Sequence, residues 1–229
     1  SRDIEAKVLS GTGTASGASF LVATGGTTLN HSDPDIAYNR SRNEHLIVWT
    51  REDLNVSTLD VWGRIVTRDG YLLGSEFNIG YHGADNLEPS VVGTPEAPGF
   101  GGYYVVWTLA LSLTNPDIYG TVVGWDGLTG PFDLISPGLQ IDYSPQIAYD
   151  EDEDLFFVAW SRLTNQTLST ADVIGFPFKP GPSQSVIESC VGGSSFAVLP
   201  FVASGTGGDF LITWSDAPST PNRDIWGRI

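Results

Sequence analysis

The chain has 229 residues, of which 41% are hydrophobic and 11% aromatic, so it can bury a sizeable core and is not disordered. Its formal net charge of −16 excludes nucleic acid and anionic membrane surfaces as favoured partners, because both would repel it. No apolar run approaches the length of a membrane-spanning helix, so we expect no membrane insertion. The one cysteine, Cys190, excludes an internal disulfide.

A repeat of about 55 residues organises the chain. A proline opens a short apolar strand in each unit, at intervals of 55, 56 and 55 residues: Pro34, Pro89, Pro145 and Pro200. A second strand ends in tryptophan, followed each time by threonine or serine: Trp49, Trp107, Trp160 and Trp214. A third strand begins with the pattern Asp-[Ile/Val]-x-Gly: Asp60, Asp117, Asp172 and Asp224. A weaker fourth strand ends the unit.

Four short strands in each repeat, rich in β-branched and aromatic residues, are typical of a β-propeller blade. The sequence therefore predicts an all-β, four-bladed β-propeller that forms a single domain over residues 1–229. The predicted blades span residues 31–80, 86–136, 142–189 and 195–229, and residues 1–26 provide the outer strand of the last blade. Each tryptophan is expected to wedge between neighbouring blades.

The two ends of the chain predict how the ring closes. The last unit stops after its third strand, and residues 18–23 have the pattern of the missing outer strand. We therefore expect the N-terminal strand to pair with the last blade, which would remove the open edge. Residues 2–8 also resemble residues 223–229, so the third strand is present twice. Either the N-terminal copy adds an extra strand, or the chain is one ring of a longer tandem array.

The repeat resembles the tryptophan and Asp-Ile-x-Gly repeats of secreted bacterial proteins without an assigned role. Its four units are similar in architecture to hemopexin-like and lectin-like propellers, although the hemopexin motif is absent. The resemblance covers nearly the whole chain and implies a secreted propeller. It does not imply an activity, since one fold hosts many functions.

Three acidic residues are the candidate catalytic groups. The segment Asp33-Pro34-Asp35 is similar to the start of an innermost strand in five-bladed arabinanase-like glycoside hydrolases, where a catalytic aspartate lies beside a proline. Glu88 precedes the next repeat proline and is the candidate for the second carboxyl that inverting hydrolysis needs. The third and fourth units have Ser144 and Leu199 at this place, so the full set of acids is missing.

The repeated aspartates Asp60, Asp117, Asp172 and Asp224 are candidate ligand-binding residues, because four equivalent carboxylates on one propeller face could hold sugar hydroxyls or cations. The alternative is that each aspartate caps a turn. Trp125 departs from the repeat and is a candidate platform for sugar stacking. The loops that follow the repeat tryptophans differ in length and content, which favours a binding face there.

Other features leave several alternatives open. We expect no cofactor and cannot assign a metal, although a structural calcium or sodium ion in the central channel is an alternative to ordered water. The acidic run at residues 150–154 lacks the spacing of a calcium loop and is expected to be a solvated turn. Four glycosylation sequons, at Asn30, Asn39, Asn55 and Asn165, point to an extracellular protein.

These observations together predict a secreted, non-enzymatic recognition module that binds carbohydrate or an extracellular protein through loops on one propeller face. A structural subunit that forms homo-oligomers or filaments is the first alternative. An arabinanase-like glycoside hydrolase that uses Asp33 or Asp35 with Glu88 is the second.

Overall fold

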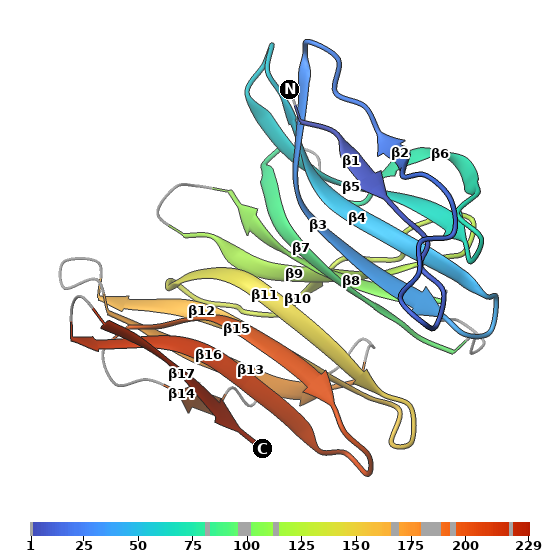
Figure 1. Cartoon of the computed structure of the whole chain (residues 1–229). Helices are drawn as coiled ribbons and strands as arrows, with labels where there is room; N and C mark the ends of the chain where they lie inside the picture. Colours follow the sequence, from blue (N-terminus) through green and yellow to red (C-terminus); the bar gives the residue numbers. More distant parts are fainter. Residues whose placement is uncertain are drawn as a thin grey trace.

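A computed structural model of the chain describes residues 2–80, 83–95, 102–111, 115–165, 170–179, 189–192, 196–219 and 222–229. The described residues are all-β, which confirms the predicted class, and they form no helix long and apolar enough to span a membrane. The strands form five antiparallel sheets, which lie side by side like propeller blades (Figure 1).

The N-terminal sheet consists of β1 (Ile4–Ala6) and β2 (Phe20–Ala23). Three four-stranded blades follow. The first is β3 (Leu29–Asn39), β4 (Glu44–Asp53), β5 (Thr58–Thr67) and β6 (Leu72–Asn78). The second is β7 (Asp85–Gly93), β8 (Tyr103–Ala110), β9 (Asp117–Val123) and β10 (Asp133–Leu134). The third is β11 (Ile141–Asp150), β12 (Leu155–Asn165), β13 (Thr170–Phe178) and β14 (Ser189–Gly192). The fourth blade has three described strands, β15 (Ala197–Ser204), β16 (Phe210–Ser219) and β17 (Asn222–Arg228).

The predicted closure of the ring is not observed, and the sheets number five rather than four. Strand β2 pairs with β1, and in the described residues the two ends of the chain lie at opposite ends of the row of sheets (Figure 1). The physical reason lies in the duplicated strand, because β1 has the third-strand pattern and occupies the place beside β2. Ile4 and Val22 bury against Ile47 and Trp49 of the first blade, which fixes β1 and β2 there.

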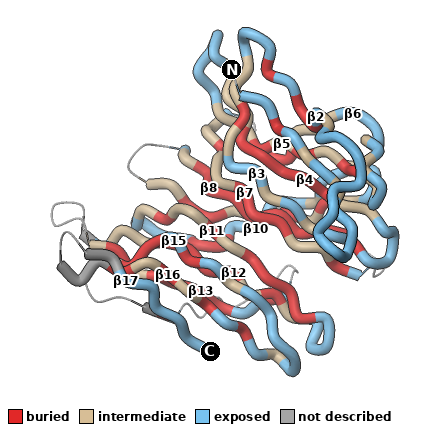
Figure 2. Tube along the Cα trace, in the orientation of Figure 1, coloured by how far each residue is buried: buried red, intermediate tan, exposed pale blue. Residues whose placement is uncertain are grey.

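The hydrophobic cores lie between neighbouring sheets, as the wedge prediction requires. The buried residues, red in Figure 2, lie mainly along the strands. Trp107 packs with Leu46 and Val48 of the preceding blade, and Trp160 packs with Val106. All four repeat tryptophans are buried: Trp49, Trp107, Trp160 and Trp214. Each tryptophan therefore faces the preceding sheet, while in the first three blades the residue before it faces the following sheet.

A β-bulge at the repeat proline bends the first strand of every blade. The pairing register shifts between Ser32 and Asp35, and the same shift recurs in β7, β11 and β15. Proline has no N–H to donate to the ladder, so a bulge is where it fits within a strand. The residue before each proline has a positive φ between 50° and 55°: Asp33, Glu88, Ser144 and Leu199.

Hydrogen bonds from these bulges join consecutive blades. The Glu88 N–H donates to the Thr50 hydroxyl at 3.1 Å, and the Leu199 N–H donates to the Ser161 hydroxyl at 3.1 Å. Thr50 and Ser161 are buried and directly follow the repeat tryptophans. The hydroxyls of Thr50 and Ser161 therefore each satisfy a backbone donor of the next blade, a role that the sequence pattern alone does not reveal. At the junction between the second and third blades, the Thr108 hydroxyl donates to Glu88 instead.

A second set of contacts joins the far ends of the first strands. The side-chain amide of Asn39 donates to the carbonyls of Thr94 at 3.1 Å and Gly102 at 2.8 Å, across to the second blade. At the equivalent place in the third blade, Asp150 accepts an N–H bond from Gly208 at 2.7 Å. Asn39 is buried by these contacts, so its sequon does not present an acceptor for a glycan. The side chain of Asn165 lies outside the described residues.

Candidate functional site

The four bulges converge on a pocket of about 290 Å³ at the axis of the molecule. First strands of all four blades contribute to it: Asp33, Pro34, Asp35, Glu88, Pro89, Ser144, Pro145, Gln146, Leu199, Pro200 and Phe201. The structure thus brings the three candidate catalytic acids, Asp33, Asp35 and Glu88, into one cavity. No lysine or arginine is among the described residues that line it.

Asp35 and Glu88 both accept hydrogen bonds from the next blade. Asp35 Oδ2 accepts the N–H of Val91 at 2.9 Å, and Asp35 Oδ1 accepts the N–H of Ile36 at 2.8 Å. Glu88 Oε2 accepts the N–H of Ser144 at 2.7 Å and the hydroxyl of Thr108 at 3.0 Å. Part of the role of these two carboxylates is therefore to hold neighbouring first strands together.

Asp33 differs from the other two acids because it is exposed and its side-chain hydrogen bond is to a neighbour in the sequence. The Ser32 hydroxyl donates to Asp33 Oδ2 at 2.9 Å. Its backbone has a φ of 50°, a region that L-residues other than glycine rarely adopt. Such strain costs on the order of 1–3 kcal/mol and persists only where the surroundings impose it, often at ligand sites. The bulge therefore presents the Asp33 carboxylate toward the pocket at an energetic cost.

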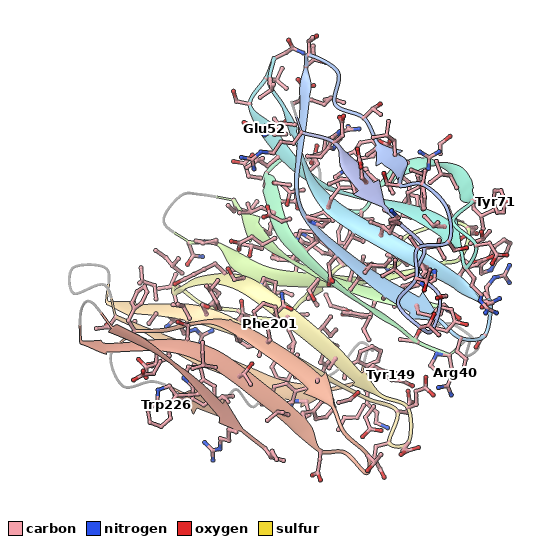
Figure 3. All side chains as sticks on the ribbon, in the orientation of Figure 1. Arg40, Glu52, Tyr71, Tyr149, Phe201 and Trp226 are labelled. Atoms are coloured by element: carbon pink, nitrogen blue, oxygen red, sulfur yellow. The ribbon has the colours of Figure 1, made fainter. Side chains whose placement is uncertain are left out.

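An exposed aromatic ring completes the pocket wall. Phe201 follows the fourth repeat proline, is 63% exposed and lines the cavity. Figure 3 places it toward the middle of the molecule, whereas Trp226 lies at the outer edge of the last blade and Tyr71 at the far edge of the first. Phe201 was not among the residues predicted from the sequence. Its signal was the aromatic residue at the place that Asp35, Ser90 and Gln146 occupy in the other units.

The four repeated aspartates do not gather at this pocket. None of Asp60, Asp117, Asp172 and Asp224 lines it, and each lies within the first three residues of the third strand of a different blade. Their environments also differ, since Asp117 is buried while Asp224 is exposed. Ligand binding by these residues stays a prediction, and the geometry gives them no common site.

Asp117 is part of a buried charged cluster between the second and third blades. Asp142, itself buried, accepts two hydrogen bonds of 2.7 Å from the Arg162 guanidinium. Asp117 Oδ1 is buried and has no hydrogen-bond partner among the described residues. Burial, and then the neighbouring Asp142 charge, raise the pKa of Asp117 from 3.8 to about 6, while Arg162 opposes them. The cluster is a source of pH-dependent stability and lies apart from the axial pocket.

Trp125 lies away from the axial pocket, in the turn between β9 and β10. Its ring is half-exposed, and the Arg42 guanidinium carbon lies 4.3 Å from the ring centroid. A guanidinium at this distance makes a cation–π contact, so one face of the ring is already occupied. The prediction that Trp125 stacks on a sugar is therefore limited to the other face.

The acidic run at residues 150–154 forms a structural turn. Asp150 is buried and accepts N–H bonds from Gly208, Asp152 and Glu153, which lower its pKa, with the Gly208 bond having the largest effect. The described residues include no group of three or more His, Cys, Asp and Glu side chains placed to hold a metal ion. A structural cation in the channel stays a prediction.

Comparisons with known proteins identify similar folds. No model of a protein family matches the chain, and no curated protein does. The solved structures that it resembles include an endo-arabinase from Bacteroides thetaiotaomicron, with a TM-score of 0.57, 15% identity, and coverage of 93% of this chain and 80% of that one. A Hadza microbial sialidase has a TM-score of 0.62 and 11% identity, over 89% of this chain and 45% of the sialidase. An N-acetylgalactosamine deacetylase from F. plautii has a TM-score of 0.51 and 10% identity, over 84% and 64%.

These comparisons correct one sequence-based interpretation. We expected a protein without enzymatic activity. This expectation is wrong, because the solved structures of similar fold are enzymes: an endo-arabinase, a sialidase and a deacetylase. Identities of 10–15% show the fold alone, so they do not transfer a reaction to this chain. The chain also spans less than half of the sialidase that it resembles.

Proposed function

We propose that the protein binds carbohydrate in the axial pocket, as a secreted protein that meets its glycan outside the cell. The observation that carries this proposal is the combination, in one cavity of about 290 Å³, of three carboxylates and an exposed aromatic ring. Carboxylates accept hydrogen bonds from sugar hydroxyls, and an aromatic face packs against the C–H groups of a sugar ring.

The charge of the pocket selects among glycans. Asp33, Asp35 and Glu88 all carry carboxyl groups, and none of the described lining residues is a lysine or arginine that could neutralise an acidic sugar. Like charges in a partly buried cavity repel strongly, because the local dielectric is lower than in water. We therefore expect neutral glycans to bind and sialylated or uronic-acid glycans to be rejected.

The position of the pocket also agrees with a binding face formed by loops. Ser32 pairs with Thr50, so the bulge at Asp33 lies beside the residue that follows Trp49. The hairpin between β4 and β5 extends beyond this point and ends in an exposed turn. Loops that follow the tryptophans are thus at the same end as the pocket and can contact the outer residues of a longer glycan.

Glycoside hydrolysis is the second candidate function, and Asp33 is the observation that favours it. A hydrolase needs one carboxyl to act on water or on the anomeric carbon and another to protonate the leaving oxygen. Asp33 is exposed at the pocket, while Asp35 and Glu88 are held in place by N–H donors of neighbouring strands. In this assignment Asp33 is the exposed carboxyl that acts on the substrate or on water, and Glu88 or Asp35 is the carboxyl held by neighbouring strands.

Binding is tested by titrating neutral and acidic oligosaccharides against the protein in a calorimeter, after a glycan array has selected the candidates. We expect a neutral glycan to bind, and Phe201→Ala to weaken this binding about tenfold through the loss of stacking, as expected for about 1.4 kcal/mol. The matched control is Tyr71→Ala, which removes an equally exposed aromatic ring far from the pocket. Binding that is equal in both variants, or seen only for acidic glycans, contradicts the proposal.

Hydrolysis is tested on the glycans that bind, by measuring the release of reducing ends. A hydrolase requires product formation by the wild-type protein and a loss of at least about 100-fold in Asp33→Asn, the range for one acid–base group. Glycan binding without product, in wild-type protein and variant alike, would identify the pocket as a binding site only. Binding to a protein surface but to no glycan would contradict both candidate functions.

A further inference from the structure

The axial pocket has an acidic side and an apolar side. First strands of the first and second blades contribute three acids, Asp33, Asp35 and Glu88. The fourth blade contributes two exposed apolar side chains, Leu199 and Phe201. The lining residues of the third blade, which lies between them, are uncharged. A ligand that fills the pocket therefore meets acids on one side and an apolar surface on the other.

The protein does not neutralise the acidic side of the pocket. None of the three acids forms an ion pair with a lysine or arginine among the described residues. The junction between the second and third blades shows the contrast, because there the buried Asp142 is paired with Arg162 at 2.7 Å. Uncompensated acids in a partly enclosed site attract a cation more strongly than acids in open water, since the local dielectric is lower.

Two carboxylate oxygens of the pocket are available to a ligand. Asp33 Oδ2 accepts the Ser32 hydroxyl, and Glu88 Oε2 accepts the hydroxyl of Thr108 and the N–H of Ser144. The other oxygens, Asp33 Oδ1 and Glu88 Oε1, accept no hydrogen bond from the described part of the chain. An ammonium group matches two such acceptors, because it has three N–H donors and no acceptor of its own.

The apolar side suits the remainder of an amino sugar. Phe201 offers an aromatic face to the C–H groups of a sugar ring, and Leu199 extends this apolar wall. An aromatic face also attracts a positive charge, so it does not oppose an amine that lies near it. The two sides together favour a ligand with a cationic edge and an apolar face.

We propose that the axial pocket selects sugars that carry a free, protonated amino group, such as glucosamine or galactosamine residues, over their N-acetylated forms. This inference rests on the proposed function, because it names the class of sugar that the same pocket binds. The ammonium group donates to Asp33 Oδ1 and Glu88 Oε1, and hydrogen bonds between charged groups are stronger than those of a neutral hydroxyl. N-acetylation removes the charge, leaves one N–H donor and adds a carbonyl oxygen that these acids cannot bind.

Two matched pairs of probes test the selection. The methyl glycosides of glucosamine and galactosamine are each compared with their N-acetyl forms by NMR titration at about pH 6, where a primary amine is protonated. We expect at least one amine to bind at least about tenfold more tightly than its N-acetyl form. This preference should decrease at high salt, because it depends on charge.

Three variants separate a contact in the pocket from attraction by the net charge of −16. Asp33→Asn removes a carboxylate and keeps the backbone, because asparagine also tolerates the φ of 50°. Glu88→Gln keeps an acceptor for the N–H of Ser144. Each should reduce the preference for the amine to about threefold or less. Asp69→Asn removes one charge at an exposed turn outside the pocket and should leave the preference unchanged.

The inference is overturned if both N-acetyl forms bind as tightly as their amines. It is also overturned if the preference persists in Asp33→Asn and Glu88→Gln, or decreases equally in Asp69→Asn. Neutral sugars that bind without a preference for the amine would leave the proposed function intact and remove this inference alone. Absence of binding by every sugar would contradict both.

Discussion

Asp117→Asn is expected to stabilise the protein at neutral pH, because the folded state disfavours the charged form of this carboxyl. The pKa of Asp117 rises from 3.8 to about 6 on folding, chiefly through burial, and the Asp142 charge adds to the effect. One pKa unit corresponds to about 1.4 kcal/mol, so the ionised carboxylate costs the fold at most about 3 kcal/mol at pH 7. The Arg162 guanidinium offsets only part of this cost, since it already makes two bonds to Asp142.

The sign of the pH dependence follows from proton binding. Between about pH 4 and pH 6 the folded protein retains a proton on Asp117 that the unfolded chain has lost, so wild-type stability decreases as the pH rises through this window. The asparagine side chain does not titrate. The gain in stability of Asp117→Asn should therefore be small at pH 4 and reach about 1–3 kcal/mol at pH 7.

The assay is urea denaturation at intervals between pH 4 and pH 7.5, with the difference in unfolding free energy taken at each pH. Asp172→Asn is the matched control, because Asp172 has the equivalent place in the third strand of the next blade but is only half-buried. A difference between wild-type protein and Asp117→Asn that does not change with pH would refute the reasoning. The same applies if the gain in stability of Asp117→Asn over the wild-type protein is smaller at pH 7 than at pH 4.

Three further substitutions test contacts between blades. Thr50→Val leaves the N–H of Glu88 without its acceptor and should lower the unfolding free energy by about 1–3 kcal/mol in urea denaturation. Folding lowers the pKa of Asp150, so the ionised carboxylate should stabilise the fold above about pH 4, and this stabilisation should be lost as the pH falls further. In Asp150→Asn the melting temperature should therefore decrease less between about pH 4 and lower pH than it does in the wild-type protein. Gly93→Ala places a Cβ against a backbone carbonyl of the preceding blade and should reduce the melting temperature by several degrees, or prevent folding, as followed by circular dichroism.

The sequence predicted the parts of the fold that repeat. The tryptophan period was enough to predict strands and the blade cores, because a large apolar side chain at a fixed interval has few alternatives to burial between sheets. Pairing of β2 with the last blade, which would close the ring, is not observed. The sequence pattern does not show which of two similar strands, β1 or β17, pairs with β2. Residues 2–8 and 223–229 share one pattern, and only packing of Ile4 on the first blade selects the copy that pairs with β2.

The candidate site was predicted in part. Asp33, Asp35 and Glu88 were selected from their places beside the repeat prolines, and the structure brings them to one pocket. Their different surroundings could not be derived from the sequence, because the N–H donors to Asp35 and Glu88 come from residues 56 positions away. The repeated aspartates lie on the third strands of separate blades, and none of them lines the axial pocket. Ligand binding by each of them within its own blade stays a prediction.

The backbone conformation at the bulges joins the fold to the proposed site. A residue before proline ordinarily adopts an extended conformation, yet Asp33, Glu88, Ser144 and Leu199 all have positive φ. Hydrogen bonds between blades compensate for this strain at Glu88 and Leu199, through the hydroxyls of the preceding blade. The hydroxyl that would compensate for Asp33 belongs to the second strand of a blade before the first.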